Sequence, residues 1–246
     1  MKIMTAFQEY LDRHFYSEFD IKAVLFDMDG VLYDSMKYHS RSWFETMNEF
    51  GYTSTPEEFY LHEGRTGGST IDLLTQRCFG RSATDEEKKR IYARKSELFT
   101  KYNEGDLIPF SLQMVKAVKA MGLKCVLVTG SGQKSLLGKL DHNFPGIFTQ
   151  DAMVTAFDVK KGKPDPEPYL MGLKKAGNLA PNQAVVVENA PMGVEAAVAA
   201  GIFTFAINTG PIAPEVLSAA GANIVLSGME DLYNNWSDFS RQLGIK

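Results

Sequence analysis

The stretch Ile21–Gly30, which reads IKAVLFDMDG, decides how this chain folds. A short apolar run over residues 21–26 ends in two acids, Asp27 and Asp29, and a glycine. An apolar run of this length, bounded by turn signals, is typical of a buried strand, and the polar residues after it indicate a functional loop. We therefore expect a buried strand whose carboxyl end carries acidic side chains.

Two later apolar runs end in the same manner. Lys124–Val128 (KCVLV) is followed by residues 129–132 (TGSG), and Ala184–Val187 (AVVV) is followed by Glu188 and Asn189. Helical patterns lie between the runs, and shorter apolar segments predict further strands. The expected helices are Ser111–Met121 and Glu167–Ala176, with Asp165 as the cap of the second and Pro166 at its first position, and the further strands are Ala152–Thr155, Phe203–Ile207 and Asn223–Leu226.

Strands that alternate with helices form βαβ units and a parallel sheet, whose ligand sites lie beyond the carboxyl ends of the strands. The expected fold class is therefore α/β, with a doubly wound, Rossmann-like parallel sheet. Residues 36–103 interrupt this rhythm, because they are rich in helix formers and charges and contain no convincing buried strand. We expect a core domain of residues 1–35 and 104–246 and a helical cap domain of residues 36–103. Ile3–Phe15 reads as a helix packed on the core, with partner binding as the alternative.

Composition restricts the partners. The formal net charge of −4 argues against general attraction to nucleic acid or to an anionic membrane surface. Two distant cysteines, Cys78 and Cys125, provide neither a disulfide framework nor a metal-thiolate spacing, which fits a reducing compartment. The charged and polar start lacks the apolar stretch of a signal peptide or membrane span. We expect a soluble, cytoplasmic monomer that binds a small molecule.

Two pairs of polar residues are candidates for a metal site. Asp27 and Asp29 are separated by one residue, so in an extended loop both could address one small volume, where a metal ion would offset their repulsion. A solvated turn that caps the next helix is the alternative. Glu188 and Asn189 offer the hard oxygen donors that Mg²⁺ prefers, although Asn189 could equally cap the helical pattern Met192–Ala200.

Two further features suit a phosphate group. Pro164 biases Lys163 towards an extended conformation that projects from its loop, although a lone loop lysine is usually solvated. Thr129 and Ser131 alternate with glycines, including Gly130, in a hydroxyl-bearing loop whose backbone N–H groups could approach a phosphate closely.

Together these loops resemble, in the required order, the four signature motifs of the haloacid dehalogenase superfamily. The resemblance covers the chain apart from an N-terminal extension of about 20 residues. It is carried by Asp27-Met28-Asp29-Gly30-Val31-Leu32, by Thr129, by Lys163 in a K-P-x-P-x-x-Y context, and by Glu188-Asn189-Ala190-Pro191-Met192-Gly193. The last motif and the helical insertion resemble the β-phosphoglucomutase-like subgroup.

The resemblance implies phosphoryl transfer on a small phosphorylated metabolite, most simply a sugar phosphate. Asp27 would be the nucleophile that forms an aspartyl-phosphate, and Asp29 the general acid and base. Mg²⁺ would be held by the Asp27 carboxylate, the Asp29 carbonyl and the Glu188/Asn189 pair. Lys163 and Thr129 would hold the remaining phosphoryl oxygens, with Gly130 and Ser131 as substrate contacts. An acid at position 29 argues against a haloalkanoate dehalogenase, which lacks one there.

The sequence departs from the family pattern at two positions. The fourth motif normally ends in two acids, but Asn189 replaces the second, which removes one negative charge from the metal shell. Gly67 stands where the mutases carry an arginine that grips the distal phosphate; Arg65 is a possible substitute or simply a surface residue. His39 aligns with a histidine of the mutases, or packs in the hinge.

Gly67 in place of the cap arginine favours a phosphatase over a β-phosphoglucomutase, because a mutase must hold a bisphosphorylated intermediate. A catalytically lapsed binding or regulatory protein is a third reading, motivated by Asn189.

Overall fold

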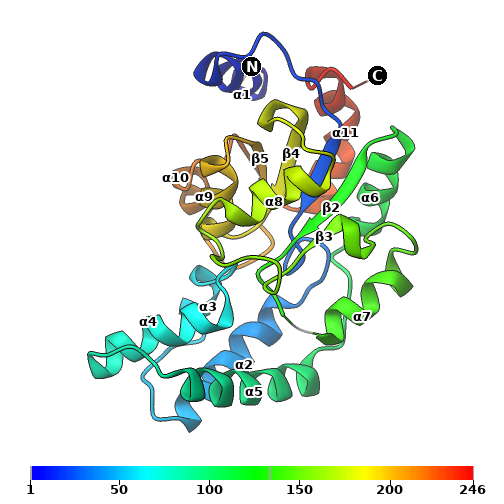
Figure 1. Cartoon of the computed structure of the whole chain (residues 1–246). Coiled ribbons are helices and arrows are strands. Elements are labelled where there is room, and N and C mark those ends of the chain that lie inside the picture. Colours follow the sequence, from blue (N-terminus) through cyan, green and yellow to red (C-terminus); the bar gives the residue numbers. More distant parts are fainter. Residues whose placement is uncertain (1, 133, 246) are drawn as a thin grey trace.

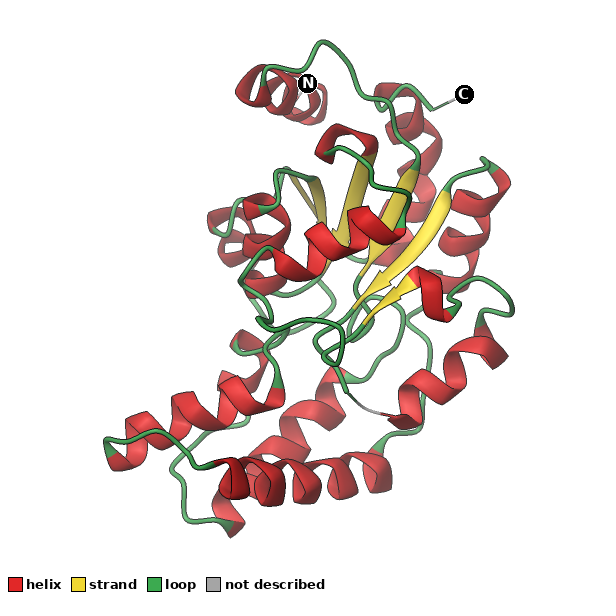
Figure 2. Cartoon of the chain, in the orientation of Figure 1, coloured by secondary structure: helices red, strands yellow, loops and turns green. Residues whose placement is uncertain are grey.

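The computed structural model describes residues 2–132 and 134–245. In this part of the chain, one parallel sheet has the strand order β3-β2-β1-β4-β5-β6, as Figures 1 and 2 show. The strands are β1 (Ala23–Phe26), β2 (Lys124–Val128), β3 (Met153–Val154), β4 (Ala184–Glu188), β5 (Phe203–Ile207) and β6 (Ile224–Leu226). From β1 the chain adds strands first on one side and then on the other, so the predicted doubly wound α/β fold is confirmed.

Helices cover both faces of the sheet. Successive strand residues point to opposite faces, so each buried strand contributes to a hydrophobic cluster on either side. In β1, Val24 and Phe26 belong to one hydrophobic cluster, whereas Ala23 and Leu25 belong to another. The first cluster includes residues of α1 (Lys2–His14), α6 (Ser111–Ala120) and α11 (Met229–Gln242), and the second includes residues of α8 (Glu167–Lys175) and α9 (Pro191–Ala199). Smaller elements complete the fold: α7 (Lys134–Asn143), α10 (Pro214–Ala219), η1 (Gln150–Ala152) and η2 (Pro181–Gln183).

Residues 36–103 form four helices, α2 (Met36–Glu49), α3 (Glu58–Leu61), α4 (Gly67–Phe79) and α5 (Asp85–Tyr102). These helices pack around a hydrophobic cluster of their own, which includes Trp43, Phe59, Leu74 and Ile91. They lie beyond the arrowheads of the sheet in Figure 2, which mark the carboxyl ends of the strands. We propose that this insertion is the predicted cap.

Two local details differ from expectation. The cap position of α8 is Pro166 rather than Asp165, although Asp165 Oδ1 still accepts the Glu167 N–H at 3.0 Å. Strand β3 is shorter than the expected residues 152–155. Ala152 ends a 3₁₀ turn, and Thr155 binds Asp158 through its N–H and its hydroxyl, both at 2.8 Å, so neither residue extends the strand.

The N-terminal helix α1 packs on the core beside β5. Phe7 stacks on Phe203, with ring centroids 4.9 Å apart and nearly parallel planes, and Tyr10 Oη donates to the Gly201 carbonyl at 2.7 Å. The extension is therefore part of the hydrophobic core in this structure. No helix of the described residues is long and apolar enough to cross a bilayer.

Phe7→Ala should lower the free energy of unfolding by about 3–5 kcal/mol, because it removes a buried ring from a packed aromatic cluster. Phe15→Ala is the matched control, since Phe15 is 95% exposed at the end of the same segment. Urea unfolding measures both variants. Equal effects of the two substitutions would contradict the packing of α1 on the core.

Candidate active site

Strand ends gather the predicted catalytic residues. Asp27 follows β1, Thr129 follows β2, and Glu188 is the last residue of β4. Phe26 pairs with Leu127 on one side and with Val187 on the other, so the three side chains leave the sheet at the same edge. All three are buried. The parallel register thus brings together residues that are up to 161 positions apart in the sequence.

Lys163 reaches this edge from the loop before α8. Its Nζ donates to Asp27 Oδ1 at 2.5 Å, to Glu188 Oε1 at 2.6 Å and to the Val128 carbonyl at 3.0 Å. Burial alone would lower the pKa of Lys163, but the two carboxylates more than offset this effect and raise it. Burial raises the pKa of Asp27 to about 8, with Lys163 opposing the shift. Lys163 is therefore a buried cation, and the solvated alternative does not apply.

Glu188 is fully engaged by protein donors. Its Oε1 accepts from Lys163 and from Tyr169 Oη at 2.8 Å, while its Oε2 accepts the backbone N–H groups of Asn189 and Ala190 at 2.8 and 3.0 Å. A Cβ at Gly193 would lie 1.7 Å from Glu188 Oε1, so only glycine fits there. These contacts suit a residue that positions Lys163 better than the expected direct metal ligand.

Asp29 is held by the hinge of the insertion. Its Oδ1 accepts from Ser35 Oγ at 2.6 Å and lies 3.0 Å from His39 Nε2. Burial would raise the pKa of Asp29, but the contacts with His39 and Ser35 more than offset it, and the pKa is lowered. The structure therefore places His39 against the candidate general acid, where it contacts Asp29.

A buried lysine continues this chain of contacts. Lys95 Nζ lies 2.7 Å from His39 Nδ1. A charged ammonium can only donate, so His39 Nδ1 then accepts and Nε2 carries the hydrogen that Asp29 receives. Sequence reasoning missed Lys95, yet a signal was present: it lies four residues from both Ile91 and Phe99, in the middle of the apolar face of α5.

Glu63, in the loop between α3 and α4, is a second buried residue that sequence reasoning missed. Both of its carboxylate oxygens lie 3.2 Å from Asn189 Nδ2. Burial raises the pKa of Glu63 well above its usual range, and the nearby carboxylates of Asp27, Glu188 and Asp29 raise it further. A single acid in a polar cap loop gives no sequence signal. Its importance appears only when the insertion is placed over the strand ends.

Asn189 does not act as the expected helix cap, because the cap position of α9 is Ala190 and no side-chain capping bond is formed. Its Oδ1 is buried and has no hydrogen-bond partner among the described residues. A Cβ at Gly30 would lie 2.0 Å from Asn189 Nδ2, so the glycine of the first motif makes room for this amide. An orphaned amide oxygen beside buried carboxylates suits a hard cation such as Mg²⁺.

The described residues contain no group of three or more His, Cys, Asp or Glu side chains already arranged around a metal position. A metal site at this edge therefore needs amide or backbone oxygens as well as carboxylates. Asn189 Oδ1 and the Asp29 carbonyl are donors of that kind.

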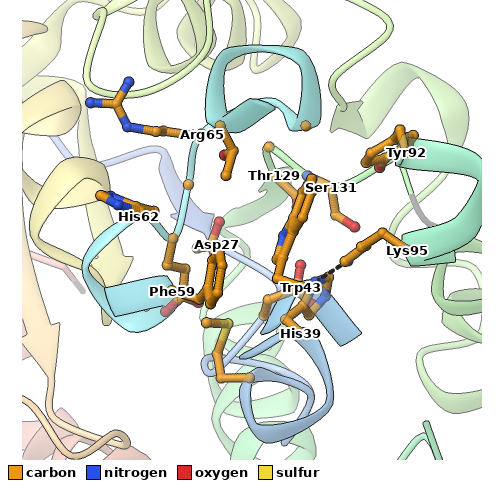
Figure 3. A pocket seen from close by; sticks show the side chains of 17 residues that line it. Asp27, His39, Trp43, Phe59, His62, Arg65, Tyr92, Lys95, Thr129 and Ser131 are labelled. Carbon is orange, nitrogen blue, oxygen red and sulfur yellow. Dashed lines mark hydrogen bonds and ion pairs between the residues drawn. The ribbon is translucent and has the colours of Figure 1, made fainter. Parts of the chain in front are cut away.

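A cavity lies between the strand ends and the insertion, and Figure 3 shows its lining. Of the residues predicted from the sequence, it is lined by Asp27, Asp29, His39, Arg65, Thr129, Gly130 and Ser131. Thr129 Oγ1 accepts the Ser131 N–H at 2.9 Å, which fixes the loop after β2. The Arg65 guanidinium points away from Asp27 (Figure 3), so Arg65 does not face the nucleophile here.

Comparison with known proteins agrees with this geometry. Residues 21–201 match the family model of the haloacid dehalogenase-like hydrolases. The chain belongs to this family. It is therefore an enzyme of the haloacid dehalogenase (HAD) hydrolase type, as the motifs predicted, and the third reading, a catalytically lapsed protein, is not supported.

Relatives of this HAD chain include phosphatases. It is 30% identical to hexitol phosphatase A of Escherichia coli K12, over 86% of this chain and 93% of that protein. It is 31% identical to a phosphorylated carbohydrates phosphatase of Thermotoga maritima, over 74% and 82%. A solved Bacteroides vulgatus protein with a provisional β-phosphoglucomutase assignment is 52% identical, with a TM-score of 0.95 and 98% of each chain covered.

The difference in stability between Lys95→Met and the wild type should depend on pH. Burial lowers the pKa of Lys95 from its ordinary 10.5 to about 7. Between these values the folded chain binds fewer protons than the unfolded chain, so the wild type gains stability as pH rises. The stability of the variant minus that of the wild type should therefore be largest below pH 7, and should fall by roughly 1–3 kcal/mol towards pH 9.5.

Urea unfolding at pH 6.5, 8 and 9.5 measures this difference. Lys101→Met, which removes a lysine charge near the end of the same helix, is the control. A flat difference for Lys95→Met would show that Lys95 stays charged throughout.

Proposed function

We propose that this HAD enzyme is a Mg²⁺-dependent phosphatase that acts on a small phosphorylated metabolite, a sugar phosphate, through an aspartyl-phosphate on Asp27. The observation that carries the proposal is the buried Lys163 ammonium, which binds Asp27 and Glu188 together below a cavity that Asp29 also lines. The phosphatases among its relatives support the substrate class.

Asp27 and Lys163 form the nucleophilic centre. Lys163 holds Asp27 Oδ1, which leaves Oδ2 to attack phosphorus; a bond then forms between Oδ2 and phosphorus as the bond to the leaving oxygen breaks. Lys163 also provides positive charge beside the phosphoryl oxygens. Because Thr129 Oγ1 accepts the Ser131 N–H, its hydroxyl hydrogen remains for a phosphoryl oxygen.

Asp29 moves the protons of both steps. Its two hydrogen bonds go to Oδ1, so Oδ2 is left for the leaving oxygen and later for the attacking water. An anionic phosphoryl group nearby raises the pKa of a carboxyl, which favours the protonated form of Asp29 needed for the first step. His39 and Lys95 keep its orientation fixed through both steps.

The residues present fit a divalent cation. The Asp27 carboxylate, the Asp29 carbonyl and Asn189 Oδ1 would hold it, with the Glu63 carboxyl group of the insertion beside Asn189. When bound, Mg²⁺ reduces the repulsion between an anionic nucleophile and an anionic phosphate. Four carboxyl groups and two lysines are buried around this cavity, so the carboxyl groups outnumber the buried cationic side chains.

A β-phosphoglucomutase is the second candidate, because the Bacteroides vulgatus relative carries that provisional assignment. A mutase needs a cationic partner for a distal phosphate, and Arg65 does not face the nucleophile. Incubation with β-glucose 1-phosphate and a bisphosphate primer separates the two. Glucose 6-phosphate forming much faster than inorganic phosphate would reverse the ranking.

Asp27→Asn should abolish phosphate release while the chain stays folded, since a neutral amide is a poor nucleophile. A metabolite panel with Mg²⁺ present gives the activity, and urea unfolding gives the stability. Asp34→Asn, a partly exposed carboxylate of the hinge, is the matched control. More than about a hundredth of wild-type activity, a loss under roughly 3 kcal/mol, would rule out the covalent mechanism.

Asn189→Asp should bind Mg²⁺ about tenfold more tightly, the effect of roughly 1.4 kcal/mol, because it adds a negative charge beside the ion. Without Mg²⁺ the variant should be less stable than the wild type, since the new carboxylate faces Glu63 in place of the amide donor. Calorimetric titration with Mg²⁺ and unfolding without it measure the two effects. An unchanged affinity would exclude Asn189 as a ligand.

A further inference from the structure

We propose that Tyr92 sets the size limit for the leaving group, so that among sugar and polyol phosphates this site favours short carbon chains over hexoses. The inference rests on the proposed phosphatase function and deepens it. Tyr92 belongs to α5 of the insertion and lines the same cavity as Asp27, Asp29 and Thr129.

The ring of Tyr92 fills the space over Gly67, the first residue of α4. A Cβ at Gly67 would lie 2.2 Å from Tyr92 Cε2 and 2.3 Å from Cδ2. Real Cβ atoms do not approach ring carbons so closely, so no side chain fits at position 67 while the ring stays in place. The Tyr92 ring therefore occupies the space that a side chain at position 67 would fill.

Tyr92 also reaches the core side of the cavity. A Cβ at Gly132, in the loop after β2, would lie 3.3 Å from Tyr92 Oη and 3.1 Å from Phe157 Cζ. One side chain thus touches α4 of the insertion and approaches the loop of the core that is expected to bind phosphate. The ring therefore forms part of the cavity wall on this side.

The remainder of the roof is aromatic as well. Trp43 of α2 lies between Phe59 of α3 and Tyr92, with ring centroids 6.1 Å from each. Among the described lining residues, the Lys95 ammonium contacts His39 and the Arg65 guanidinium points away from Asp27. Such a roof offers apolar contact to a short carbon chain.

The roof sits close to the core because glycines allow backbones to meet. A Cβ at Gly130 would lie 2.4 Å from the Gly64 carbonyl oxygen, and a Cβ at Gly162 would lie 2.7 Å from Thr66 Cγ2. The loop between α3 and α4 therefore rests directly on the two core loops that carry Thr129 and Lys163. With the insertion in this position, the Tyr92 ring lies close to the core loops that border the cavity.

The first experiment compares phosphate release from glycerol 1-phosphate and glucose 6-phosphate by the full-length chain with Mg²⁺. The wild type should prefer glycerol 1-phosphate, and Tyr92→Ala should raise the relative kcat/KM for glucose 6-phosphate at least about tenfold, mainly through KM. Tyr92→Phe should keep the wild-type preference, because the ring and not the hydroxyl fills the space. Tyr102→Ala, on the same helix and away from the cavity, is the control.

The second experiment tests the contact itself. Gly67→Ala alone should lower both the melting temperature and kcat/KM, because the new methyl group displaces the ring. In a Tyr92→Ala background, Gly67→Ala should change the melting temperature and kcat/KM only a little. Equal losses of melting temperature and kcat/KM in the two backgrounds would overturn the proposal. If Tyr92→Ala fails to fold, Tyr92→Leu takes its place.

The outcomes distinguish a failure of the proposed role of Tyr92 from a failure of the proposed phosphatase function. Phosphate release with an unchanged preference in Tyr92→Ala overturns the role of Tyr92 and leaves the phosphatase in place. No release by the wild type from either substrate or from a wider metabolite panel overturns the phosphatase and the size limit together.

Discussion

The buried ammonium of Lys163 is the interaction on which the site depends. It binds the Asp27 carboxylate after β1 and the Glu188 carboxylate at the end of β4. Tyr169 and two backbone N–H groups donate the other hydrogen bonds to Glu188. Buried charges are tolerated only when paired and hydrogen-bonded, and removal of one partner costs several kcal/mol. The order of the central strands is thus required by the electrostatics of the site as well as by the hydrophobic faces of the sheet.

The insertion supplies part of the chemistry as well as a cover. Lys95 orients His39, which contacts Asp29, and Glu63 contacts Asn189. The core motif lacks one acid at position 189, and the insertion returns a carboxylate to the same place. The Glu63 carboxyl group lies beside the proposed metal position because the loop after α3 rests on the core.

Short-range patterns in the sequence predicted the core well. Strands β2 and β5 have the expected bounds, and Thr129 and Asp27 lie together because parallel strands place their carboxyl ends at one edge. Lys163 reaches the same edge from the loop before α8. Glu63 and Tyr92 were not predictable, because their roles come from contacts between the insertion and the core that no local periodicity encodes. Lys95 lies between these cases: a lysine on an apolar helical face indicates a buried charge, but its partner His39 is 56 residues away.

The floor and the roof of the cavity have different proposed roles in the reaction. The floor, built from strand ends, carries the groups that we propose bind the phosphoryl group, and its geometry is fixed by the register of a buried sheet. The roof, built from aromatic residues of three helices, is proposed to contact the leaving alcohol. Substitutions in the roof can therefore alter which alcohol leaves without disturbing Asp27 or Lys163. The exception is the His39–Lys95 pair, through which a change in α5 reaches Asp29 and hence the proton transfers.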